Sequence, residues 1–308
     1  MALFGTSRKL ASVPPVNPEL ESFLENYSIE VMPRTAAKID DFRALLPAHT
    51  RVYIAHLEGT PIDDMVATAK RLSEQGFDVM PHFPARIIKD KQELGDWISR
   101  YQGEAGVRQA LLLAGGLNKP LGAFHSSIQL IETGLFDAAG FTDLHVAGHP
   151  EGNKDIDPDG SRREVDAALS WKQAYGERTD AKMALATQFC FEAGPVIEWA
   201  DGLKAQGIDI PVHIGIAGPA KLQTMIKFSI ACGVGASLRV LQRRAKDVTK
   251  LLLPFEPTSI LTDLAAHKAA NPEFNIERVH FFPLGGIKTN ATWAMEHGGN
   301  SAIPAMKS

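Results

Sequence analysis

The chain has 308 residues, of which 44% are hydrophobic and 22% charged, and its formal net charge is −4. An acidic balance with scattered Lys and Arg and few aromatic residues excludes the basic, aromatic-rich surface of a nucleic-acid-binding domain. No apolar run approaches the roughly 18 residues that span a bilayer, so no membrane segment is expected. The N-terminus lacks the apolar core of a secretory signal, and two cysteines are too few for a disulfide framework, which together predict a cytoplasmic protein.

The first element expected is a short helix over Pro18–Tyr27, within an N-terminal extension of residues 1–26. Short β-rich runs then recur, each followed by a helical pattern. The runs cover residues 27–33, 51–57, 77–83, 108–115, 143–150, 182–189, 211–218 and 278–285. Their near-continuous hydrophobic character is typical of parallel strands that are covered on both faces.

The helical patterns between these runs have recognisable ends. After the second run, Thr60-Pro61 opens a helix with acidic residues in its first turn, and Gly76 is a suitable C-terminal cap. Its predicted apolar stripe is Ile62, Met65, Val66, Ala69 and Leu72. The same scheme predicts a helix over 195–206 that ends at Gly207, and a helix over 219–231 that has an apolar stripe of Leu222, Ile226 and Ile230 and ends at Gly233. Residues 234–272 are long enough for two more helices. Of the two cysteines, Cys190 is expected to be packed in a strand and Cys232 in a helix.

Eight alternating strand and helix units favour a single (β/α)8 TIM barrel over residues 27–295, followed by a tail over 296–308. An open, doubly wound α/β sheet is the alternative. The absence of a GxGxxG motif after the first strand counts against a Rossmann fold.

Polar residues cluster where the predicted strands end, which in a barrel is the face that carries function. Each strand offers at most one histidine there, and neither HxH nor HExxH occurs, so a metal-dependent barrel hydrolase is only an alternative. Gly115-Gly116 allows a ligand to approach the backbone closely, and His149, Asn153 and Gln188 can bond ring nitrogens and carbonyls. This pattern suits a flavin or a pterin better than a metal.

Seven segments occur in the order and spacing of one family. They are SIEVMPRT (28–35), VMPHF (79–83), LLLAGGLNKP (111–120), HVAGHPEGN (145–153), ATQFCF (186–191), IGIAG (214–218) and HFFPLGG (280–286). Together they resemble the catalytic domain of the methylenetetrahydrofolate reductase family. The resemblance implies a TIM barrel that uses FAD to pass a hydride from NADH or NADPH to 5,10-methylenetetrahydrofolate. It places the chain in one-carbon metabolism and methionine biosynthesis, with a small-molecule folate as substrate and with a tendency to form homo-oligomers.

The resemblance also implies roles for individual residues. Glu30 matches the proposed general acid that helps to open the folate's imidazolidine ring, and Gln188 matches the glutamine that binds the pterin. Leu222 falls where a bulky residue borders the nicotinamide or folate. The residues expected to touch FAD are His82, Gly115, Gly116, His149, Asn153, Asp166 and Lys172.

The chain departs from the family pattern at three of these positions. Gly116 stands where an aspartate is usual, His149 where a tyrosine is usual, and Asn153 where a histidine is usual. The missing aspartate leaves open a third interpretation, a non-catalytic or partner-dependent folate-binding barrel.

Some of these residues could instead have a purely structural role. Glu30 could pair with Arg34 at the rim, whereas burial beside a flavin would raise its pKa, as a general acid requires. Gln188 is expected to be a buried amide within an apolar strand, and His56 and His213 are expected to be structural. The basic run over residues 239–246 is interpreted as a solvated helix face, or as a site for a folate tail or a nucleotide phosphate.

Overall fold

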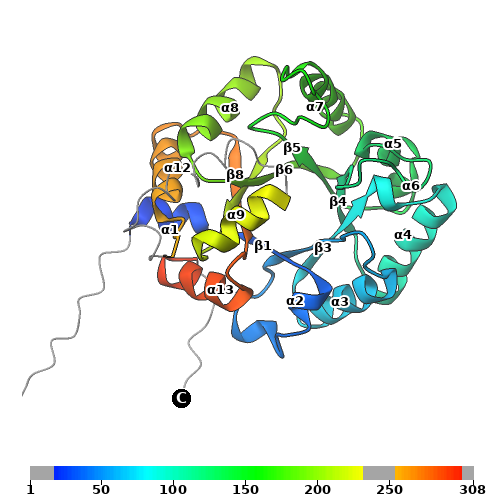
Figure 1. Cartoon of the computed structure of the whole chain (residues 1–308), viewed down its shortest axis with the longest axis horizontal. Helices are drawn as coiled ribbons and strands as arrows, with labels where there is room; N and C mark the ends of the chain where they lie inside the picture. The colour runs from blue at the N-terminus through cyan, green and yellow to red at the C-terminus, as the bar shows by residue number, and fades with distance from the viewer. Residues whose placement is uncertain (1–16, 232–253, 300–308) are drawn as a thin grey trace, which may run out of the picture.

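The computed structural model describes residues 17–231 and 254–299. Its strands form a closed parallel barrel surrounded by helices (Figure 1). Each strand pairs in parallel with the next along the chain, and β8 closes the ring onto β1. The predicted single-domain (β/α)8 TIM barrel is therefore confirmed, and the open doubly wound sheet is wrong.

All eight predicted strands are present. They are β1 (Ser28–Val31), β2 (Arg51–Ile54), β3 (Asp78–Pro84), β4 (Gln109–Leu113), β5 (Asp143–Gly148), β6 (Lys182–Cys190), β7 (Val212–Ala217) and β8 (Ile276–Phe282). Alternate side chains of each strand point to opposite faces. In β1, Ile29 and Val31 are buried among the helices, which turns Glu30 toward the inside of the barrel.

Helices and short 3-10 turns fill the connections. They are α1 (Pro18–Leu24), α2 (Pro33–Ala36), η1 (Phe42–Ala44), α3 (Ile62–Glu74), η2 (Ala85–Ile87), α4 (Lys91–Ala105), α5 (Ser127–Glu132), α6 (Leu135–Ala138), α7 (Arg163–Gly176), α8 (Ala193–Ala205), α9 (Leu222–Ala231), α12 (Thr258–Ala270) and α13 (Ile287–Glu296). The first of these ends at Leu24, three residues before the predicted boundary, because Glu25 leaves the helical region at ψ 136.

Helix α3 shows how local sequence sets these elements. Asp63 and Asp64 occupy its first turn, where negative charge is favoured by the helix dipole. Four residues of the predicted stripe are buried on one side, namely Met65, Val66, Ala69 and Leu72. Gly76 follows the helix at φ +87, a left-handed conformation that glycine adopts without steric cost.

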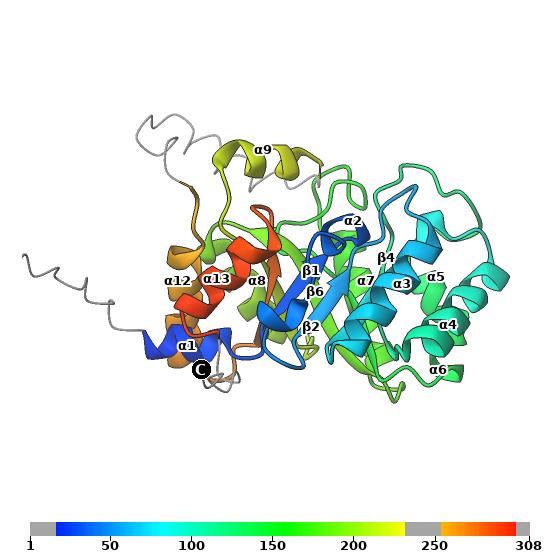
Figure 2. The same cartoon turned by 90° about the horizontal axis from the view of Figure 1, so that it is seen from below.

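Helix α9 lies beyond the carboxyl ends of the strands rather than beside the barrel wall (Figure 2). Its Leu222 and Met225 are buried and Ile226 is partly buried, but Ile230 is 63% exposed. The predicted apolar stripe is therefore wrong at Ile230. Within the described ranges, no helix combines the length and apolar character needed to cross a membrane.

Several predictions concern residues outside the described ranges. They include the residues before position 17, the tail from 300 onward, Cys232, Gly233 and the basic run over 239–246. Cys190 is described, and it is packed in β6 as predicted.

Candidate functional site at the carboxyl mouth of the barrel

Glu30 lies inside the barrel, next to two histidines from other strands. Its Oε2 is 3.3 Å from Nε2 of His82 on β3 and 3.9 Å from Nε2 of His280 on β8. Its side chain is 19% exposed, so the carboxylate can still be reached from solvent. Arg34 is exposed and forms no ion pair with Glu30, so the predicted structural pairing at the rim is wrong.

The two imidazoles control the charge of Glu30. Burial by itself would raise the pKa of Glu30, but the adjacent imidazoles of His280 and His82 stabilise the carboxylate more and lower its pKa to about 2. The raised pKa expected of Glu30 beside a flavin stays a prediction, and among the protein's own groups the imidazoles outweigh burial. Glu30 is a carboxylate at neutral pH, and it is suited to stabilising a positive charge.

His280 joins this cluster to the barrel wall. Its Nδ1 lies 3.0 Å from the hydroxyl of Ser28 on β1, while its other nitrogen faces Glu30. Its ring also contacts Tyr53, with 4.3 Å between the ring centroids. These contacts fix the orientation of the ring, so that Nε2 of His280, and not Nδ1, faces the carboxylate of Glu30.

Next to His280, Tyr53 connects two further histidines. Its hydroxyl lies 2.5 Å from Nδ1 of His145 on β5 and 3.3 Å from Nδ1 of His213 on β7. All three residues are buried, and burial lowers the pKa of both imidazoles, that of His213 to about 4. The predicted structural role of His213 therefore takes the form of a hydrogen-bond network inside the barrel.

Tyr53, His145 and His280 were not among the residues predicted from the strand ends. Strand alternation contains the signal that would have found them, because each lies two positions from a polar inward residue of its own strand. Tyr53 follows Arg51 in this way, His145 follows Asp143, and His280 follows Arg278. All three residues lie in the bodies of their strands and not at the strand ends.

Gln188 lies near the carboxyl end of β6, where the strand is irregular. The pairing of β6 with β7 shifts between Ala186 and Phe189, so Gln188 is exposed and is not the buried amide that was predicted. The close approach of the strands requires glycine at position 215. A Cβ there would lie 2.5 Å from the backbone oxygens of Thr187 and Gln188.

An apolar wall borders the mouth beside β6 and β7. Its buried members are Phe189, Phe191, Ala217, Ala220, Leu222, Met225 and Phe255. The rings of Phe189 and Phe282 meet edge to face at 5.4 Å. Leu222 therefore contributes to a hydrophobic surface of the kind on which a flat aromatic ligand can pack.

The segment after β5 brings His149 close to Lys172 of α7. Burial and the charges of Lys172 and Arg162 lower the pKa of His149 to about 4, so the imidazole is neutral at pH 7. In the described part of the chain, the ring of His149 makes no hydrogen bond. Lys172 is buried, with its Nζ 2.8 Å from the carbonyl oxygen of Ala147, and burial lowers its pKa to about 8.

Two other predicted residues of this segment are engaged within the protein. The side-chain oxygen of Asn153 accepts a hydrogen bond from the backbone of Asp155 at 2.9 Å. Asp166 pairs with Arg162 at 3.3 Å, and Arg162 also donates to the carbonyl oxygen of His149. Both residues therefore stabilise the conformation of the loop.

The two glycines after β4 behave differently. Gly115 has φ +91, and a Cβ on it would lie 3.0 Å from Cβ of Pro84. Gly116 is exposed, and a Cβ there would meet no atom within 4 Å. The structure therefore has room at position 116 for a ligand or for a side chain such as the family's aspartate.

His56 is hydrogen-bonded and stacked within the protein. Nε2 of His56 lies 3.0 Å from the carbonyl oxygen of Thr60, and its ring stacks on Trp97 at 4.8 Å, so its role is structural as predicted.

Among the described residues, no group of three or more His, Cys, Asp or Glu side chains is arranged to hold a metal ion.

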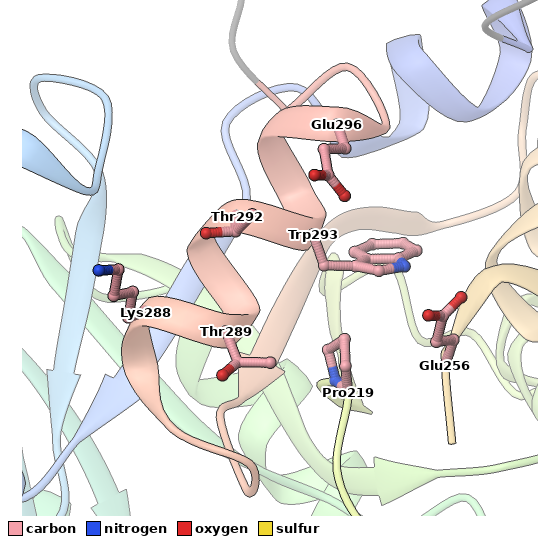
Figure 3. A pocket seen from close by; sticks show the side chains of 7 residues that line it. All are labelled: Pro219, Glu256, Lys288, Thr289, Thr292, Trp293 and Glu296. Atoms are coloured by element: carbon pink, nitrogen blue, oxygen red, sulfur yellow. The ribbon is translucent and has the colours of Figure 1, made fainter. Parts of the chain in front are cut away.

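Outside the barrel, a cavity of about 410 Å³ lies between α13 and the residues around Pro219. Trp293 and the carboxylates of Glu256 and Glu296 line it (Figure 3). It contains none of the predicted site residues.

The predicted residues thus share one end of the barrel, but they form separate groups. Glu30 and His82 are in contact, His149 lies beside Lys172, and Leu222 belongs to the apolar wall near Gln188. All lie at or beyond the carboxyl-terminal halves of their strands.

Comparisons with known proteins give only remote structural matches. No protein-family profile matches the chain. One similar structure is a β-mannanase of Thermomonospora fusca in complex with mannohexaose, with 13% identity, a TM-score of 0.36, and coverage of 61% of this chain and 68% of the mannanase. Another is a candidate sugar phosphate isomerase/epimerase of Anabaena variabilis, with 10% identity, a TM-score of 0.29, and coverage of 83% and 73%.

Proposed function

We propose that the chain is a flavin-dependent reductase that converts 5,10-methylenetetrahydrofolate to 5-methyltetrahydrofolate with electrons from NADH or NADPH. The observation that carries the proposal is the ionised Glu30 inside the carboxyl mouth, flanked by His82 and His280. The motif order described above supplies the substrate class, because a carboxylate between imidazoles is compatible with many reactions.

The residues at this mouth fit the ring system of a flavin. Neutral His149 can accept a hydrogen bond, Gly115 and Gly116 expose backbone, and the apolar wall around Leu222 offers a packing surface. His82, Gly115, Gly116 and His149 would hold FAD, which supplies the hydride carrier between the two substrates. Three further residues could contact FAD only through polar atoms that are not already bonded within the protein. They are Asn153, Asp166 and Lys172.

The protein's own part in the reaction centres on Glu30. Opening of the folate's imidazolidine ring leaves a cationic iminium, and a carboxylate whose pKa is lowered to about 2 stabilises that cation. His82, at 3.3 Å from the carboxylate, keeps Glu30 in place. Gln188 is exposed at the same mouth, where its amide can pair with the edge of a pterin.

Glu30→Gln tests the proposal. The variant keeps the shape of the side chain and removes its charge, so it should bind flavin normally but reduce methylenetetrahydrofolate at least about 100-fold more slowly. The measurements are the visible absorption spectrum and NADH or NADPH oxidation with the folate under anaerobic conditions. Glu58→Gln, an exposed carboxylate after the neighbouring strand, is the matched control and should retain full activity.

The same measurements identify the alternatives. Full folate reduction by Glu30→Gln would remove Glu30 from the mechanism. A colourless wild-type protein that binds reduced folate without oxidising a nicotinamide would contradict the reductase and leave a folate-binding barrel. A stoichiometric divalent metal without flavin would favour the hydrolase.

A further inference from the structure

A cavity of about 410 Å³ opens at the end of the barrel opposite Glu30. Arg51, Asp143 and Lys182, which line it, are the first residues of β2, β5 and β6. The cavity therefore lies at the amino ends of the strands. This is the end of a TIM barrel at which polar residues usually serve stability.

Positive charge is in excess around this cavity. Arg51, Lys182 and Arg278 line it with only two carboxylates, Asp143 and Glu277. The surplus is one positive charge, as long as the two histidines of the lining are neutral.

The cations are only partly used by the protein itself. Arg51 donates to Asp143 at 2.8 Å and contacts Nε2 of His145 at 3.1 Å, but its Nε is buried without a partner. The side chain of Arg278 forms no hydrogen bond or ion pair with any residue in the described ranges. Burial and the nearby charge of Arg51 lower the pKa of Arg278, so the two guanidinium groups repel one another.

The histidines of the lining do not add to the repulsion. His145 and His213 are buried, and burial keeps the pKa of each below its ordinary value. Each uses its Nδ1 on the hydroxyl of Tyr53, and His213 turns its Nε2 to Glu277 at 3.2 Å. The two imidazoles are therefore uncharged lining residues whose positions are fixed by hydrogen bonds.

We propose that this cavity binds a small oxyanion, the phosphate or carboxylate group of a metabolite, between the cationic side chains of Arg278, Lys182 and Arg51. Guanidinium groups present paired N–H donors that match phosphate and carboxylate oxygens, and such charge-assisted hydrogen bonds are the strong ones. An anion here would relieve the repulsion between the two arginines.

The site is independent of the proposed reductase activity, because it lies at the other end of the barrel and requires neither flavin nor folate. Its test is calorimetric titration of the full chain with inorganic phosphate, and separately with succinate at matched ionic strength. We expect one ion to bind per chain. The tighter of the two ligands identifies whether a phosphate or a carboxylate is preferred.

Arg278→Met and Lys182→Met should each weaken this binding at least about tenfold. Arg163→Met removes a charge at the first turn of α7, near the opposite mouth, and should bind the ion as the wild type does. Arg278→Met is expected to fold with an unchanged or higher Tm, because it removes one of two repelling charges. The ion should raise the Tm of the wild type but not that of this variant.

Two results would overturn the proposal. One is that neither anion binds to the wild-type chain. The other is that Arg278→Met and Arg163→Met bind with the same affinity, which would place the ion elsewhere.

Discussion

At the scale of single residues, two buried tyrosines make the value of the inner hydrogen-bond network measurable. Tyr53 and Tyr101 are both fully buried. The hydroxyl of Tyr53 contacts His145 and His213, whereas that of Tyr101 has no partner among the described residues. The same substitution therefore removes a used polar group at one position and an unused one at the other.

Tyr53→Phe should lower the free energy of unfolding by about 1–3 kcal/mol, because it leaves buried imidazole nitrogens unpaired. Tyr101→Phe should leave the stability unchanged or increase it, because it removes a desolvated hydroxyl that gains nothing in return. Urea denaturation of the three proteins measures both. Equal losses for the two variants would show that the network around Tyr53 adds no stability.

The orientation of side chains was predictable from sequence only where regular strand geometry holds. Alternation in β1 correctly turns Glu30 away from Ile29 and Val31. Gln188 could not be placed in this way, because the shift in pairing between Ala186 and Phe189 breaks the alternation and exposes the amide. The low pKa of Glu30 depends on His280, which comes from a strand 250 positions later in the chain and is invisible to local patterns.

At the scale of elements, α4 supports the strand that carries His82. Its Trp97 and Tyr101 pack on Phe83 of β3, with ring centroids 6.4 Å and 5.3 Å apart. Asp90 is the N-cap of α4, and its carboxylate accepts a hydrogen bond from the backbone N–H of Glu93 at 2.9 Å. The start of α4 therefore depends on one N-cap.

Asp90→Ala should destabilise the protein by about 1 kcal/mol, because the N–H of Glu93 loses its acceptor. Asp96→Ala, on the exposed face of the same helix, removes the same charge without removing a cap and should change stability by less than about 0.5 kcal/mol. Thermal unfolding compares the two variants. If both melt at the same temperature as the wild type, the cap does not determine the stability of α4.

Element positions were more predictable than element ends. All eight strands and the helices around 62–74 and 195–206 follow from periodicity and from their glycine stops. The end of α1 at Leu24 and the exposure of Ile230 were not foreseen. Both depend on what the surrounding chain covers, and the sequence of a single helix does not contain that information.

At the scale of the whole molecule, the buried histidines make stability depend on pH. Burial lowers the pKa of His56, His149 and His213 to about 4, and that of His145 and His280 also lies below 6.5. Between pH 6.5 and 4 the unfolded chain therefore binds more protons than the folded one, and stability falls as the pH is lowered. Glu30, whose pKa is lowered to about 2, adds a further loss below its ordinary value of 4.5.

Each such histidine should decrease the free energy of unfolding by up to about 1.4 kcal/mol per pH unit across this window. Urea denaturation at several values between pH 8 and pH 4.5 measures the slope. His56→Gln should make the slope shallower, because one imidazole no longer titrates on unfolding. A wild-type stability that is constant from pH 7 to pH 5 would contradict this assignment of the buried histidines.

The middle of the barrel is filled by Tyr53, Met80, Leu111 and Ala186. These packed side chains lie between the Glu30 mouth and the arginine-lined cavity at the opposite end of the barrel. The cavity and Glu30 are linked through contacts of Tyr53, whose hydroxyl meets His145 of the cavity lining and whose ring meets His280 beside Glu30. Substitutions at the arginine-lined cavity and at the Glu30 mouth can therefore be studied one at a time, and the contacts of Tyr53 are where an influence of one on the other should be sought.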